Sequence, residues 1–126
     1  APYVHVADDD ISFCREGLQR VIADFDADPA LDIITTRSTM PEPRVFPPNG
    51  HDLATVYRYY HTISFEISVR RSALEAHGIR FSLLAGIGAP FLTAGEEELL
   101  MYHMLRSGMK GRFADVVLSV HPGLTT

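Results

Sequence analysis

The sequence lacks several features that would assign the protein to a common class. Cys14 is its only cysteine, so no disulfide can form within the chain and nothing implies an oxidising compartment. No apolar run is long enough to span a membrane. The first residues, APYVHVADDD, lack the basic start and apolar core of a secretory signal. The net charge of -5 argues against a nucleic-acid partner, so we expect a soluble, cytoplasmic protein.

Familiar catalytic motifs are missing as well. The sequence has no Walker-type P-loop, no GxGxxG and no CxxC, and Gly86-Ile87-Gly88 is too short to form a phosphate loop. No GxSxG nucleophile elbow supports a Ser–His–Asp triad. Cys14 belongs to no recognisable catalytic motif, so we expect it to pack in a helix face as a small apolar residue.

The 126 residues suffice for one domain, and a hydrophobic content of 46% allows a real core. A buried strand is expected over Tyr3 to Ala7, followed by a helix from Phe13 to about Asp26 with Ser12 as its cap. A second strand follows over Leu31 to Thr36. This order is the strand–helix–strand unit of a sheet with crossover helices, so we predict an α/β fold.

The second half repeats the alternation of strands and helices. In chain order we expect a half-buried strand over Ile63 to Val69, a helix over Ser72 to His77 ended by Gly78, a helix over Glu96 to Ser107 ended by Gly108, and a strand over Val116 to Val120. The segment Met40 to Asp52 is rich in proline and should be irregular, either beside a site or as a solvated connector. Thr55 to Thr62 could be strand or helix.

Asp8, Asp9 and Asp10 follow the first predicted strand directly. Ligands of open α/β sheets bind at the carboxyl ends of strands. Adjacent carboxylates repel one another, which favours a cation between them, and oxygen ligands suit Mg²⁺ or Mn²⁺. A solvated acidic turn that caps the next helix explains the same residues equally well.

Acidic residues also open the helix expected at Glu96, in the run Gly95-Glu96-Glu97-Glu98. The helix dipole keeps a carboxylate there ionised, which suits a general base, although glutamate in a first turn is also ordinary helix chemistry. His121 follows the last predicted strand, where it is either a metal or phosphate ligand or a polar strand end.

Taken in order, these features resemble the family 2 glycosyltransferases of the GT-A fold. The matching segments are VADDDIS, LDIITTR, ISFEISVRRSALEAHGIRF, AGIGAPFLTAGEEELLMYHMLRSG and VVLSVH. In that family an apolar strand ends in Asp-x-Asp, a Gly-rich stretch leads into an acidic helix start, and a final strand often ends in histidine. The resemblance spans Tyr3 to His121. It implies a three-layer α/β/α fold with a mixed, mostly parallel sheet.

The resemblance also implies a metal and donor site. Asp10 would coordinate Mn²⁺ or Mg²⁺, and Asp8 would contact the donor ribose or help to hold the metal. Asp9 would lie with Asp8 on the cofactor-binding side, and His121 would be a further metal ligand. The implied donor is a nucleoside-diphosphate sugar.

The implied reaction is a single displacement with inversion. Glu97 matches the catalytic base, and Glu96 would hydrogen-bond the acceptor or support the base. The acceptor is a saccharide or another hydroxyl compound. We expect its pocket to be built from Met40 to Asp52 and Phe81 to Ala94.

One part of the family pattern is absent. The N-terminal strand, polar turn and Tyr-Asn that grip the nucleotide base do not occur. Residues 1–126 therefore resemble a single domain that is the C-terminal, metal- and acceptor-side part of the catalytic domain, and we expect weak or no donor binding alone. The strand near Tyr3 should then be a sheet edge through which the chain self-associates into a homo-oligomer.

Two other classes remain as alternatives. A response-regulator receiver domain has a similar length and acidic start, with Asp52 near the position of its phospho-accepting aspartate. However, the prolines before Asp52 are incompatible with a buried strand, and Lys110 is followed by Gly111 and not by the expected proline. A non-catalytic α/β interaction module is the other alternative.

Overall fold

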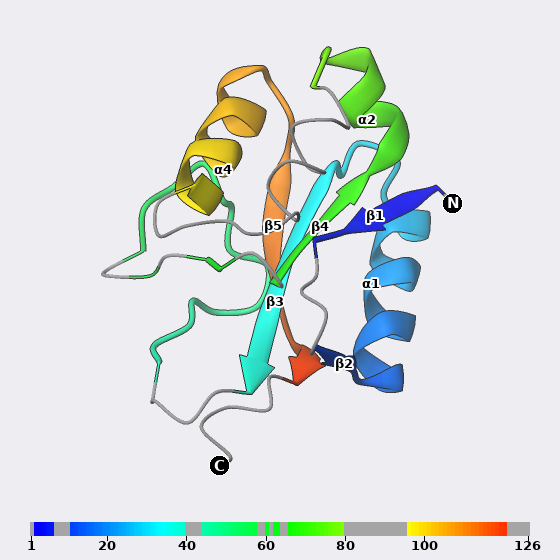
Figure 1. The fold of residues 1–126 in the computed structure, drawn as a ribbon, viewed down its shortest axis with the longest axis vertical. Helices are drawn as coiled ribbons and strands as arrows, with labels where there is room; N and C mark the ends of the chain where they lie inside the picture. Colours follow the sequence, from blue (N-terminus) through cyan, green and yellow to red (C-terminus); the bar gives the residue numbers. More distant parts are fainter. Residues whose placement is uncertain are drawn as a thin grey trace.

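The computed structural model describes residues 2–6, 11–39, 44–57, 60, 62–63, 66–79 and 96–120, with the backbone alone for residues 96–99. Its strands are β1 (Tyr3–His5), β2 (Ser12–Phe13), β3 (Ile33–Thr39), β4 (Ile67–Arg70) and β5 (Gly111–Val120). Its helices are α1 (Arg15–Ala27), α2 (Arg71–Ala76) and α4 (Glu96–Arg106). The predicted α/β class is confirmed (Figure 1).

The described strands form one mixed sheet in the order β1-β4-β3-β5-β2. Only β3 and β5 pair in parallel, whereas β1–β4, β3–β4 and β2–β5 are antiparallel. The prediction of a mostly parallel sheet is therefore wrong for these strands. The described residues between β3 and β4 form no α-helix, and an antiparallel neighbour needs no crossover helix, so β4 returns directly beside β3.

Apolar residues pack on both faces of the sheet, because neighbouring positions of β3 point in opposite directions. Ile33 packs with residues of β4, α2 and α4, including Leu74 and Met104. Ile34 packs on the other face with Phe25 of α1 and Leu118 of β5. Accordingly, α1 and α4 lie on opposite sides of the sheet in Figure 1.

Gly17 allows α1 to lie directly on β5. A Cβ atom at this position would be 2.2 Å from the Val117 carbonyl oxygen and 2.7 Å from the Leu118 Cα. These are backbone atoms that cannot move aside without shifting the strand. The position therefore requires glycine, and the close contact fixes α1 against the strand that pairs with β2.

Several predicted boundaries change in the structure. Ser12 does not cap α1; it pairs with Val120, and the helix begins at Arg15 after Cys14, which makes no side-chain cap bond. The last strand begins earlier than predicted, at Gly111. Gly78 and Gly108 end their helices as predicted, with φ angles of 70° and 99° that favour glycine.

The strand predicted over Ile63 to Val69 is shorter and more buried than its alternating pattern suggested. Among the described residues of this range and its end, Ile67–Arg70 is strand, and both Glu66 and Ser68 are buried together with Ile67. Both faces of the sheet are covered at this point, so Glu66 and Ser68 do not reach solvent although they are polar positions of the pattern. In the described part of the chain, no helix has the length and apolar character needed to cross a membrane.

Candidate active site

The residues proposed from the sequence fall largely beyond what the structure describes. Asp8, Asp9, Asp10 and His121 lie outside the described residues. Glu96 and Glu97 form the start of α4, as predicted, but only their backbone is described. The described side chains contain no group of three or more His, Cys, Asp or Glu residues that could hold a metal ion. The roles of these residues therefore remain predictions.

Described residues that stand close to Asp10 and His121 in the sequence pair with each other in the sheet. Ser12 pairs with Val120 and Phe13 with Ser119, and the Cys14 amide donates to the Leu118 carbonyl at 2.8 Å. In the sequence, Asp10 stands two positions before Ser12, and His121 follows Val120 directly. The start of β2 and the end of β5 thus lie side by side at one end of the sheet.

The carboxyl ends of three strands point toward this same end of the sheet. β1 is antiparallel to β4, β4 is antiparallel to β3, and β3 is parallel to β5, so β1, β3 and β5 run in one direction. Val6, which follows β1, donates its amide to the Ile67 carbonyl at 3.1 Å. In open α/β sheets, ligands bind at this end, beyond the carboxyl ends of the strands.

A buried ion pair stabilises this end of the sheet. Glu66 is fully buried, and its carboxylate accepts hydrogen bonds from Arg44 Nη1 and Nη2, the latter at 3.1 Å. Ser38 Oγ donates to the same carboxylate at 2.7 Å, and the Ile63 amide donates at 3.2 Å. These donors satisfy the buried charge and attach the irregular segment that begins at Arg44 to the ends of β3 and β4.

Aromatic rings pack beside the ion pair. The Phe46 ring lies between two guanidinium groups, with Arg37 Cζ at 4.8 Å and Arg44 Cζ at 4.7 Å from its centroid. Its centroid is 5.8 Å from that of Phe113 and 6.1 Å from that of Tyr60. These contacts hold residues 44–48 against β5 without regular secondary structure, which agrees with the irregular segment predicted from its prolines.

Tyr60 lies under this aromatic cluster and donates its hydroxyl to Thr35 Oγ1 at 3.2 Å. Burial raises the pKa of Tyr60 above its usual value, and this effect outweighs the hydrogen bond with Thr35, which lowers the pKa. The nearby Glu66 carboxylate also raises it. Tyr60 therefore stays a neutral phenol well into the alkaline range.

This shift predicts a difference between wild type and Tyr60→Phe at high pH. Above a pH of about 10 the unfolded chain loses the Tyr60 proton while the folded chain keeps it, so stability falls as pH rises through the folded pKa. Tyr60→Phe should cost about 1 kcal/mol at neutral pH, from the lost hydrogen bond, but show a shallower alkaline decline. Urea unfolding across this pH range measures both. Parallel declines for the two proteins would contradict the assignment.

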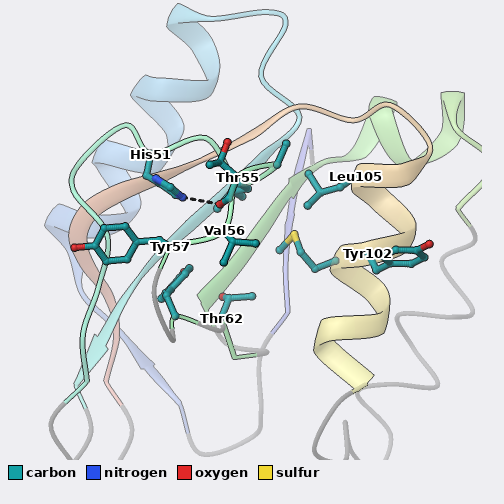
Figure 2. A pocket seen from close by; sticks show the side chains of 11 residues that line it. His51, Thr55, Val56, Tyr57, Thr62, Tyr102 and Leu105 are labelled. Atoms are coloured by element: carbon teal, nitrogen blue, oxygen red, sulfur yellow. Dashed lines mark hydrogen bonds between the residues drawn. The ribbon is translucent and has the colours of Figure 1, made fainter.

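A cavity of about 350 Å³ opens between the segment from His51 to Thr62 and helix α4 (Figure 2). Its described lining residues are His51, Leu53, Ala54, Thr55, Val56, Tyr57, Tyr60, Thr62, Met101, Tyr102 and Leu105. The expected acceptor segments agree only in part, because His51 alone of the described lining residues belongs to Met40 to Asp52, and Phe81 to Ala94 lie outside the described residues. The sequence signal that could have indicated this wall is the tyrosine cluster around Tyr57 and Tyr60.

Backbone hydrogen bonds fix the first wall of the cavity to the sheet. The Leu53 amide donates to the Gly111 carbonyl at 3.0 Å, and the Phe113 amide donates to the His51 carbonyl at 2.9 Å. His51 Nε2 donates to the Thr55 carbonyl at 2.8 Å, a bond visible in Figure 2. The sequence allowed either strand or helix for Thr55 to Thr62. In the structure, Thr55 to Tyr57 form neither.

Asp52 does not have the position that a receiver domain requires. It forms an isolated antiparallel bridge with Arg112, and its Oδ1 accepts the Ala54 amide at 2.9 Å. It lies in a turn and does not end a strand. Together with the antiparallel pairings of the sheet, this geometry disfavours a phospho-accepting role.

Comparisons with known proteins identify a similar fold but no sequence family. No protein-family model matches the sequence, and no curated protein matches it. Among solved structures, the chain is similar to the crystal structure of S. aureus TarS 1-349, with a TM-score of 0.67 and 17% sequence identity. The match covers 96% of this chain and 36% of that chain, so the protein spans little more than a third of its structural neighbour. At this identity the likeness shows the fold alone, a glycosyltransferase-like α/β fold.

Proposed function

We propose that the chain belongs to a glycosyltransferase that moves a sugar from a nucleoside-diphosphate sugar to an acceptor hydroxyl. The fold likeness supports this, since TarS is a glycosyltransferase and the match covers nearly all of this chain. The observation that carries the proposal is the pairing of Ser12 with Val120. Ser12 follows Asp10 by two residues and Val120 directly precedes His121, and the pair lies at the end of the sheet where ligands of open α/β sheets bind. The finer assignment, to family 2 and the three-layer GT-A fold, is part of the same proposal.

The proposed metal ligands are Asp8, Asp10 and His121, with Asp8 and Asp9 toward the donor. Carboxylate oxygens and one imidazole form a donor set that suits Mn²⁺ and, with water ligands, Mg²⁺. When bound, the metal would neutralise charge on the departing nucleoside diphosphate. The Ser12–Val120 pair supports this site, because Ser12 and Val120 stand close to Asp10 and His121 in the sequence.

The proposed base is Glu97, in the first turn of α4. The helix dipole there favours an ionised carboxylate, which takes the proton of the acceptor hydroxyl. The acceptor oxygen then bonds to the anomeric carbon while the bond to the diphosphate breaks, and the configuration inverts. Glu96 hydrogen-bonds the acceptor or supports Glu97.

Paramagnetic broadening by Mn²⁺ tests the metal site. In the ¹⁵N spectrum of this chain, substoichiometric Mn²⁺ should broaden the amide signals of Ser12 and Val120 first, because they flank the proposed ligands. Asp10→Asn and His121→Ala should weaken Mn²⁺ binding by about tenfold or more, since each removes a ligand. The matched control is Glu75→Gln, which removes an exposed carboxylate of α2 that pairs with Arg71. Broadening centred elsewhere, or unaffected by Asp10→Asn, would contradict the proposal.

A further inference from the structure

We propose that the cavity between His51–Thr62 and α4 binds the acceptor, and that this acceptor is an uncharged alcohol or phenol with an apolar body. The inference rests on the proposed function and adds the class of substrate. It is carried by the chemistry of the lining, by the exposed apolar side chains at its rim, and by the position of α4.

The described lining contains no Asp, Glu, Lys or Arg. A phosphate or carboxylate ligand placed there would find no cation among these residues, and burying an unpaired charge is costly. A second hollow near the start of β5 has the opposite character, since Asp28, Asp52, Lys110 and Arg112 all line it. Charged ligands are therefore disfavoured at the first cavity in particular.

Most polar groups of the lining are already hydrogen-bonded within the protein. His51 Nε2 donates to the Thr55 carbonyl at 2.8 Å, and the Tyr60 hydroxyl donates to Thr35 at 3.2 Å. The Tyr102 hydroxyl accepts from Arg106 Nη1 at 3.1 Å. Few polar groups remain to bind the many hydroxyls of a sugar, so the surface offered to a ligand is chiefly apolar.

Apolar side chains border the cavity and remain exposed. Val56 is 87% exposed and Tyr102 is 55% exposed, although both line the cavity. Figure 2 shows Val56 on the loop side, across from α4, which carries Leu105 and Tyr102. Apolar side chains that border a hollow are typical of ligand-binding grooves. Met101 adds a flexible side chain that adapts to ligands of different shape.

The position of α4 explains why the ligand is the acceptor. Met101 and Leu105 both line the cavity and are four residues apart, so they share one face of the helix. Position 97 is one further step of four residues on that face, about 6 Å from Met101 along the helix axis. The proposed base thus precedes the cavity wall on the same side of α4, where an acceptor hydroxyl must lie. A volume of about 350 Å³ is near the lower limit of ligand pockets, which suits a small apolar body.

A titration with matched small molecules tests the proposal. Benzyl alcohol is the neutral probe, benzoate and benzylammonium are its charged counterparts, and methyl β-D-glucopyranoside is the polar one. In ¹⁵N spectra of this chain, benzyl alcohol should shift the amides of residues 54–57 and 101–105. The charged and polar probes should bind about tenfold more weakly or not at all, because the described lining holds no charged side chain to pair with them and few polar groups that are not already hydrogen-bonded.

Variants at exposed positions keep the test independent of folding. Val56→Lys places a charge at the cavity and should weaken benzyl alcohol binding by about tenfold. Val45→Lys is the control, since Val45 is 60% exposed on the same irregular segment but does not line the cavity. Absence of shifts with benzyl alcohol, equal binding of the charged probes, or tighter binding of the glucoside would each overturn the proposal.

The outcome separates this proposal from the proposed function. Cavity shifts without Mn²⁺ broadening at Ser12 and Val120 would support an apolar ligand site but count against the transferase. Mn²⁺ broadening without cavity shifts would leave the transferase standing and overturn the acceptor class.

Discussion

Replacing Glu66 by alanine is expected to lower the free energy of unfolding by about 3 kcal/mol. Glu66 is fully buried, and its carboxylate accepts from both Nη atoms of Arg44, which is itself only 20% exposed. The variant leaves the guanidinium largely buried without this carboxylate. Ser38 and the Ile63 amide also lose their acceptor. Urea unfolding of the two proteins at neutral pH measures the difference.

Two controls distinguish loss of the buried pair from loss of any carboxylate. Asp24→Ala removes a pair with Arg20 that is partly exposed, at 3.2 Å, and should cost less than about 1 kcal/mol. The double variant Arg44→Ala with Glu66→Ala should be less destabilised than the sum of the single variants, because the second change removes no further ion pair. A loss for Glu66→Ala no larger than that for Asp24→Ala would refute this account.

Features set by nearby residues could be predicted from the sequence. Apolar residues at helical spacing predicted α1, and Val21 and Phe25 are buried as that spacing implies, whereas Leu18 and Ile22 remain exposed. Gly78 and Gly108 end their helices because their backbone conformation favours glycine, whatever the surrounding fold. β1 is an edge strand of the described sheet, as expected, and self-association through it stays a prediction.

Features set by distant partners could not be predicted. The alternation around Glu66 indicated a strand with one solvated face, but Arg44, 22 residues earlier, supplies the charge that permits its burial. The residues around Ser12 predict a helix cap, but Ser12 pairs with Val120 in the sheet. The direction of β4 depends on pairing with both β1 and β3, which no local pattern encodes.

The candidate site likewise combines features that local sequence could predict with features that depend on distant partners. The order of acidic and histidine motifs indicated a metal and a base, and Ser12 and Val120 bring the flanks of two of those motifs together. The cavity was missed because its walls come from distant segments, the region of His51 to Thr62 and the end of α4. The tyrosines around Tyr57 and Tyr60 are the one local signal for the first wall, and the packing of the two segments is needed to show that they form a pocket.

Replacing Glu97 by glutamine is expected to lower the rate of sugar transfer by about 10² to 10⁴-fold in the full protein, the usual contribution of a general base. Glutamine has nearly the same shape but accepts no proton from the acceptor hydroxyl. The loss should appear in kcat with little change in KM, because the proton moves only in the transition state. Initial rates with saturating donor and varied acceptor measure both constants.

The matched control is Glu98→Gln, which removes a neighbouring carboxylate from the same helical turn and should leave kcat within a few-fold of wild type. Residues 97 and 98 are about 100° apart around the helix, so their side chains leave it in different directions, and Glu98→Gln tests whether loss of any carboxylate at the helix start lowers the rate. An unchanged kcat for Glu97→Gln would show that another group takes the proton. Equal losses for Glu97→Gln and Glu98→Gln would mean that the charge of the helix start matters, and not a base at position 97. A selective loss at Glu97 would support the assignment of the base to that position.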